Sequence, residues 1–160
     1  LPMRAVTHMY CLRFDESLDD CRSVIDLAAR VGQARGELIS RSTSSWILLD
    51  QSEFLLAEQH ARRGLEAVEA IGARRFIPLF NDVIARIRLH AGDRAGALEL
   101  LDESWKVSLE TGVAFAGPVV LGSIALATAD PGRRFRARRS TDDGTPRRNV
   151  RATQAPAGAC

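Results

Sequence analysis

The sequence has few of the residues that build metal centres and disulfide frameworks. Its 160 residues include three cysteines, three histidines and no CxxC pair. Three scattered cysteines do not form a disulfide framework, so we expect Cys11 and Cys21, which lie in apolar helical stretches, to be buried reduced thiols. His8, His60 and His90 fall on separate predicted helices, and none has a second ligand three or four positions away. No metal site is expected.

Motifs of nucleotide-binding and hydrolytic enzymes are also absent. The sequence contains neither the GxxxxGK[ST] phosphate loop nor the GxSxG nucleophile elbow. Adjacent acidic residues, such as those at 19–20 and 102–103, point away from one another on a helix and are typical of solvated faces. We therefore expect neither catalysis nor a cofactor in this chain.

Long apolar runs are missing as well. No stretch approaches the roughly 20 apolar residues that cross a bilayer, and no basic-then-apolar leader opens the chain. We expect a soluble, cytoplasmic protein without membrane contact. Because residue 1 is Leu and the helical pattern is already under way at Ala5, we expect the natural N-terminus to lie upstream, in a longer protein.

What the sequence does contain is a self-match at a spacing of forty residues. Glycines follow similar helical runs at Gly32, Gly72 and Gly112. Small residues recur in the same register, at Ala5, Ser45, Ala85 and Ala125 in one set and at Ser17, Ala57 and Ala97 in another. This spacing predicts a repeat made of two helices that approach closely where the small residues meet.

Apolar residues at helical spacing predict seven helices, most of them ended by glycine or a polar turn. They span residues 3–14, 18–31, 37–50, 53–71, 76–91, 94–111 and 115–129. Pro78 and Pro118 are each expected in the first turn of a helix, where no backbone donor is needed. The expected fold is all-α: a tetratricopeptide-like α-solenoid of about 3.5 helical hairpins with a period of about 40 residues.

Charge divides the chain into two predicted regions. Residues 1–131, the expected repeat domain, hold 14 Lys and Arg against 18 Asp and Glu, whereas residues 132–160 hold eight arginines against two aspartates. The second region has few large apolar residues, so we expect a disordered tail. The last helix would then lack a partner, which predicts a truncated array or self-association through that helix. A third hypothesis is that the tail lies outside the ancestral reading frame.

Within one repeat, Ala85, Ala97, Leu101 and Ser104 have the spacing of tetratricopeptide signature positions, although the family's usual period is about 34 residues. Three stretches are also suggestive: MRAVTHMYCLRFDESLDDCR, LLDQSEFLLAEQHARRGLEAVEAIGARRF and IRLHAGDRAGALELLDESWKVSLETG. Over about residues 3–131 the chain resembles the C-terminal helical repeats of large bacterial signalling ATPases, especially those linked to a class III adenylate/guanylate cyclase domain. The resemblance implies a regulatory or interaction region and carries over no active-site residue.

In hairpin arrays of this type, the first helix of each pair lines the concave face. That placement predicts a partner-binding surface, made of Ser42, Trp46, Asp82, Arg86 and His90. The expected partner is a protein or peptide segment, or another domain of the parent protein. A different hypothesis is a free-standing adaptor whose basic tail binds nucleic acid non-specifically, with an affinity that falls steeply with salt.

Overall fold

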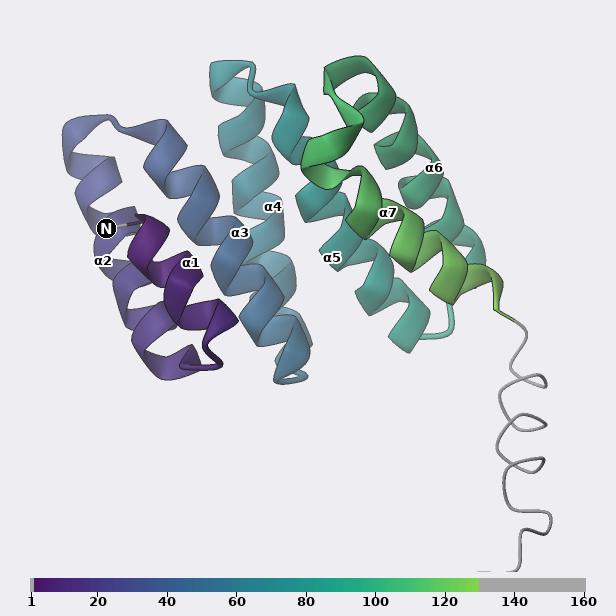
Figure 1. Cartoon of the computed structure of the whole chain (residues 1–160), viewed down its shortest axis with the longest axis horizontal. Coiled ribbons are helices and arrows are strands. Elements are labelled where there is room, and N and C mark those ends of the chain that lie inside the picture. The colour runs from purple at the N-terminus through teal and green to yellow at the C-terminus, as the bar shows by residue number, and fades with distance from the viewer. Residues whose placement is uncertain (1, 130–160) are drawn as a thin grey trace, which may run out of the picture. The chain divides into compact units, whose positions relative to one another are not determined.

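The computed structural model describes residues 2–129, and this part of the chain is all-helical, as the sequence predicts. Seven α-helices and one short 3-10 helix follow one another in this range (Figure 1). They are α1 (Pro2–Tyr10), α2 (Phe14–Val31), α3 (Ala34–Asp50), α4 (Phe54–Ile71), η1 (Arg74–Phe76), α5 (Ile77–His90), α6 (Arg94–Thr111) and α7 (Val113–Thr128). The described helices form one compact unit that ends at Thr128.

Several predicted boundaries are wrong, among them the start of α3, which begins at Ala34 rather than at residue 37. Helix α1 ends at Tyr10 rather than near residue 14, because Leu12 adopts a left-handed conformation with φ of 57° and turns the chain. As a result, Phe14 already belongs to α2. Pro78 lies in the first turn of α5 as predicted, but Pro118 lies inside α7, which begins five residues earlier, at Val113.

Three helix ends have the same geometry, although only one of them contains glycine. The φ angles of Leu12, Ser52 and Gly92 are 57°, 64° and 84°. After each of these residues, the next backbone N–H donates to a carbonyl five residues earlier, the bond that closes a Schellman end. These bonds join Arg13 to His8, Glu53 to Leu48 and Asp93 to Arg88, at 2.9, 2.8 and 2.9 Å. Each pair of helices thus reverses direction in the same way.

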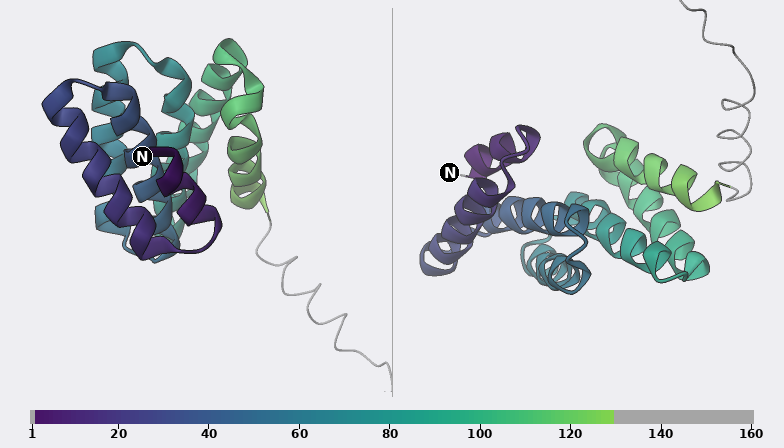
Figure 2. Two further views of the ribbon diagram at one scale, coloured as in Figure 1. Left: turned by 60° about the vertical axis from the view of Figure 1, so that its left-hand side comes forward. Right: turned by 90° about the horizontal axis from the view of Figure 1, so that it is seen from below.

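The helices are arranged in two layers. The odd-numbered helices α1, α3, α5 and α7 each contact the next odd-numbered helix, whereas α2, α4 and α6 pack chiefly against the helices that precede and follow them. The right-hand view in Figure 2 shows α1 and α7 on the same side of the molecule, with α3 and α5 between them. No helix in the described range is long and apolar enough to span a bilayer.

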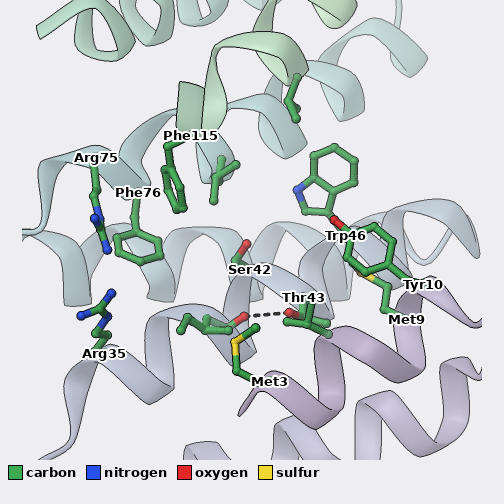
Figure 3. Close-up of a pocket in the computed structure, with 14 residues that line it drawn as sticks. Met3, Met9, Tyr10, Arg35, Ser42, Thr43, Trp46, Arg75, Phe76 and Phe115 are labelled. Carbon is green, nitrogen blue, oxygen red and sulfur yellow. Dashed lines mark hydrogen bonds between the residues drawn. The ribbon is translucent and has the colours of Figure 1, made fainter. Parts of the chain in front are cut away.

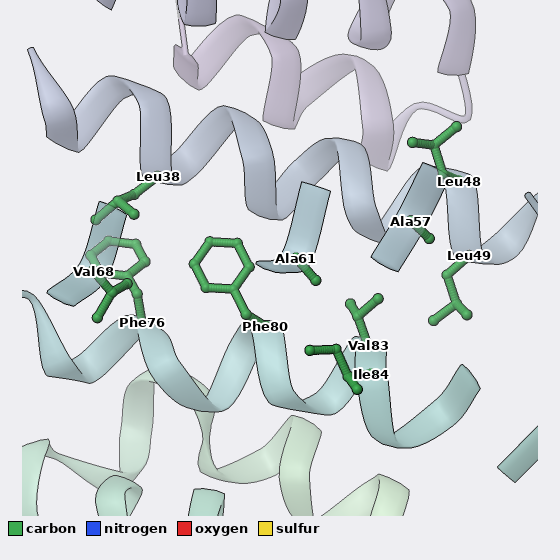
Figure 4. Packing of buried hydrophobic residues seen from close by; sticks show 10 residues of the cluster. All are labelled: Leu38, Leu48, Leu49, Ala57, Ala61, Val68, Phe76, Phe80, Val83 and Ile84. Carbon is green, nitrogen blue, oxygen red and sulfur yellow. The ribbon is translucent and has the colours of Figure 1, made fainter. Parts of the chain in front are cut away.

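The larger core cluster lies where α3, α4 and α5 meet (Figure 4). At its centre, Phe80 of α5 is fully buried against Gly64 of α4. A Cβ atom at Gly64 would lie 2.3 Å from the Phe80 ring, so this glycine makes room for the aromatic side chain. A second cluster joins α5, α6 and α7 through Ala85, Leu101 and Val120.

Small residues occupy the tightest helix contacts. Ala5, Ser45 and Ala85, which are spaced by forty residues, have no exposed surface. The Ser17 hydroxyl donates a 2.7 Å hydrogen bond to the Ala5 carbonyl, so the two small positions of the first pair of helices meet directly. Ala125, the fourth residue of this series, is exposed, because no helix in residues 2–129 covers that face of α7.

The cysteine prediction is correct for one residue and wrong for another. Cys21 is buried in α2, and its burial raises the pKa of the thiol, although the hydroxyls of Ser44, Ser40 and Ser17 partly oppose that shift. Cys11 is exposed, because it lies in the turn that follows α1 rather than within a helix. The third cysteine falls outside the described residues.

Candidate functional site

A groove of about 500 Å³ opens on the face formed by the odd-numbered helices (Figure 3). One wall comes from α1 and the other from η1 and α7, while α3 and α5 form the floor. Its lining is mainly apolar: Met3, Val6, Met9, Tyr10, Ile39, Trp46, Phe76, Leu79, Phe115 and Val119, with Arg35, Ser42, Thr43 and Arg75 as the polar members. Such a surface can hold an apolar segment of another molecule.

Positions forty residues apart recur along this lining. Ile39, Leu79 and Val119 form one series, on α3, α5 and α7. Arg35, Arg75 and Phe115 form a second series, one turn earlier. The groove therefore consists of equivalent helix faces placed side by side, and each face contributes side chains from the same two positions of the repeat.

One end of the groove is formed by a methionine and two aromatic residues. Figure 3 shows Met9, Tyr10 and Trp46 close to one another at this end. Trp46 is partly buried, and the guanidinium carbon of Arg86 lies 5.5 Å from the centre of its ring. Tyr10 is 79% exposed, so its ring is available to a partner. A methionine side chain adapts to varied apolar shapes, and a tyrosine offers a large apolar ring with a polar hydroxyl, which suits a docking surface.

The other end of the groove is cationic. Arg75 places its guanidinium carbon 5.3 Å from the Phe76 ring centre and 5.1 Å from that of Phe115, whose rings meet edge to face at 5.2 Å. Arg35, on α3, points toward Arg75 in Figure 3. Contacts with ring faces leave the N–H groups along the guanidinium edge free to donate hydrogen bonds.

These groove arginines differ from most others in the described residues, which form ion pairs with carboxylates. The paired arginines are Arg4, Arg13, Arg22, Arg41, Arg62, Arg63, Arg74 and Arg88. Within residues 2–129, Arg35, Arg75 and Arg86 have no such ion pair, and no acidic residue lines the groove. The groove therefore carries uncompensated positive charge.

A buried carboxylate fixes the wall formed by α1. Asp20 of α2 is only 7% exposed, accepts hydrogen bonds from the Nε and Nη2 groups of Arg4, and lies 3.6 Å from Nδ1 of His8. The hydrogen bond from Arg4 is the main reason why the pKa of Asp20 lies below its usual value. Both basic residues belong to α1, so this contact attaches the short helix to the rest of the unit.

The structure separates the five residues predicted to contact a partner. Ser42 and Trp46 line the groove. Arg86 does not line it but contacts the Trp46 ring from α5. His90 is exposed at the end of α5, where the centre of its ring lies 4.9 Å from that of Phe54 with the rings tilted by 33°, and it does not line the groove.

The prediction for Asp82 is wrong, because its side chain is fully buried and cannot present a charge to a partner. The physical reason is that α7 packs directly on α5 and covers the face that Asp82 occupies. Burial raises the pKa of Asp82 to about 6, while Ser123 of α7 and the charge of Arg86 partly oppose the shift. Ser123 does not complete a hydrogen bond in the structure, since neither Asp82 carboxyl oxygen has a partner within residues 2–129.

Sequence reasoning missed most of the groove, above all the α1 wall and the pair formed by Arg35 and Arg75. The signal was present in the period itself, because Arg35 and Arg75 stand forty residues apart and precede Ile39 and Leu79 by one helical turn. The prediction chose positions further along each helix, beginning at Ser42 on α3. It therefore included Ser42 and Trp46, which line the groove, but also Asp82, which α7 covers.

Other predicted features stay predictions. The eight arginines of residues 132–160, and with them the expected disorder and nucleic-acid binding, lie outside the described residues. Within residues 2–129, no three His, Cys, Asp or Glu side chains gather as a metal site would require.

Comparisons with protein-family models, curated proteins and solved structures found no match to this chain.

Proposed function

We propose that the chain is a tetratricopeptide-like α-solenoid that binds a peptide segment of a protein partner in the groove between α1 and α7. The observation that carries the proposal is the groove itself, which is mainly apolar and open, and lies on the layer of odd-numbered helices. The proposed activity is binding, without catalysis.

Three features support the repeat architecture. Left-handed residues close helix ends at Leu12, Ser52 and Gly92, forty residues apart, with matching hydrogen bonds. The small residues predicted to sit at helix contacts are fully buried at Ala5, Ser45 and Ala85. The lining of the groove repeats at the same interval. Independent features with one period are expected of stacked hairpins, each of which buries its neighbour's apolar face.

Selection from a phage-displayed library of random linear peptides tests the binding proposal. Peptides enriched on the full chain should lose affinity for the Tyr10→Ala variant, because the exposed ring of Tyr10 stands at the aromatic end of the groove. The matched control is Leu55→Ala, since Leu55 of α4 is 72% exposed but lies away from the groove. If no peptide is enriched, or if both variants bind the selected peptides as the unaltered chain does, the proposal is wrong.

We also propose, from the resemblance over residues 3–131, that the chain is the regulatory or interaction part of a bacterial signalling ATPase linked to an adenylate/guanylate cyclase domain. Sequencing the genomic locus on both sides of the coding region tests this proposal. An upstream phosphate-binding loop and cyclase domain in a continuous reading frame would support it. A flanking sequence that encodes neither would contradict it.

A second candidate function is self-association through α7, favoured by the exposure of Ala125. The face around this residue carries exposed Leu121 and Leu126, and α7 contains no charged side chain to oppose contact with a second copy. We propose that α7 of one copy packs against α7 of another. Light scattering should then show a dimer that Leu121→Asp dissociates. A monomer at every accessible concentration of the unaltered chain would refute this proposal.

A further inference from the structure

The positive charge at one end of the groove has no partner among the described residues. Residues 1–131 are acidic overall, with 14 basic and 18 acidic side chains, and most arginines of residues 2–129 form ion pairs. Arg35 and Arg75 are exposed and form none. Two adjacent cations repel one another at low ionic strength. A negatively charged ligand placed between them is attracted to both and relieves this repulsion.

We infer that the groove recognises a peptide in which an acidic side chain lies near a large apolar one. The carboxylate would lie between Arg35 and Arg75, and the apolar side chain would enter the space bounded by Met9, Tyr10 and Trp46. This inference rests on the proposed peptide-binding function and specifies the chemistry of the partner.

The geometry at Arg75 suits a carboxylate as the group that anchors the peptide at this end of the groove. Its guanidinium carbon lies 5.3 and 5.1 Å from the ring centres of Phe76 and Phe115, so the two rings hold the cation in place, and no acidic residue lines the groove to pair with it. A carboxylate has two oxygens and can accept hydrogen bonds from both arginines at once. Arg35 faces Arg75 from α3 (Figure 3), so the two donors converge on one space.

The two ends of the groove also determine the polarity of binding. Met9, Tyr10 and Trp46 lie at one end, and Arg35 and Arg75 lie at the other, where Arg75 contacts Phe76 and Phe115 (Figure 3). A peptide with one acidic and one apolar anchor can therefore satisfy both ends in a single direction along the groove. Reversing the peptide would place its acidic group on apolar side chains, where desolvation without a partner is costly.

The test combines peptide selection with charge variants of the full chain. Peptides enriched from the random library should carry Asp or Glu near an aromatic or large aliphatic residue. For a selected peptide labelled with a fluorophore, anisotropy should show a loss of affinity of roughly tenfold on Arg35→Gln or Arg75→Gln, because each variant removes a charge-assisted hydrogen bond. Replacing the acidic peptide residue by its amide should give a similar loss, and added salt should weaken binding.

Arg63→Gln is the control, since Arg63 lies on α4, pairs with Glu66 and has a 68% exposed side chain. It should leave the affinity unchanged. If selected peptides depend on Tyr10 but not on Arg35 or Arg75, the inference about the carboxylate is wrong and the binding function stands. If they depend on none of the three residues, or if no peptide is enriched, the proposed function fails and the inference fails with it.

Discussion

The guanidinium carbon of Arg86 lies 5.5 Å from the centre of the Trp46 ring, and this contact joins α5 to α3 at the aromatic end of the groove. The two residues occupy positions forty residues apart, so one side chain of each repeated face reaches the same space. Arg86 itself does not line the groove, so a residue outside the lining supports a groove-lining ring.

Replacing Arg86 by Gln should lower the free energy of unfolding by about 0.5–1 kcal/mol, the range of a partly exposed cation–π contact. Urea denaturation of the full chain measures this loss. In a chain that already carries Trp46→Leu, the same replacement should cost much less, because the ring is no longer present. Equal losses in both backgrounds would show that the contact contributes nothing.

Gly64→Ala should destabilise the protein by about 1–3 kcal/mol, since the new methyl group would overlap the buried Phe80 ring and force the core to shift. The control is Gly122→Ala in α7, where a Cβ atom meets nothing within 4 Å. That replacement should stabilise the helix by roughly 0.5–1 kcal/mol. Thermal unfolding of both variants checks the prediction, and a neutral Gly64→Ala would contradict the packing of Phe80 on α4.

Ser52→Gly should raise the free energy of unfolding by about 1 kcal/mol, because a left-handed residue with a Cβ is strained and glycine is not. The φ angle of Ser52 is 64°, close to that of a glycine at a helix end. Gly92→Ala, at the equivalent position forty residues later, should have the opposite effect and a similar size. Chemical denaturation of the pair measures both, and changes of the same sign would contradict the assigned geometry.

Asp82 should make the free energy of unfolding decrease as pH rises, whereas a carboxylate in an ion pair makes it increase. Its pKa in the folded protein is about 6, above the value of about 3.9 in an unfolded chain, so the folded state binds the proton more tightly between these values. The contribution of this group is therefore fully present below about pH 4 and is lost as pH rises through 6. A shift of about two units corresponds to roughly 3 kcal/mol.

Asp82→Asn, which carries no titratable proton, should remove this dependence. The variant should gain stability relative to the unaltered chain as pH rises from 4 to 7, with little difference at the acid end. Urea midpoints across this range give the comparison, in which the other carboxylates contribute equally to both proteins. A difference between the two proteins that does not change with pH would show that Asp82 titrates normally.

The sequence predicted the seven helices because glycines at positions such as 32 and 72 end clear apolar periods. It failed at Leu12, where the chain enters the left-handed region without a glycine to signal the turn. Trp46, chosen because the first helix of each hairpin is expected to line the concave face, does line the groove. Asp82 could not be placed, because its burial depends on α7 crossing α5, and a repeat pattern does not specify which face a neighbouring helix covers.

The most direct test of peptide binding in the groove uses the two tryptophans of the chain as reporters. Trp46 lines the groove, whereas Trp105 packs against the cluster formed by α5, α6 and α7. In a nitrogen–proton correlation spectrum, a selected peptide should shift the Trp46 indole signal and leave that of Trp105 in place. Binding that moves only the Trp105 signal, or neither signal, would contradict the claim that the groove is the binding site.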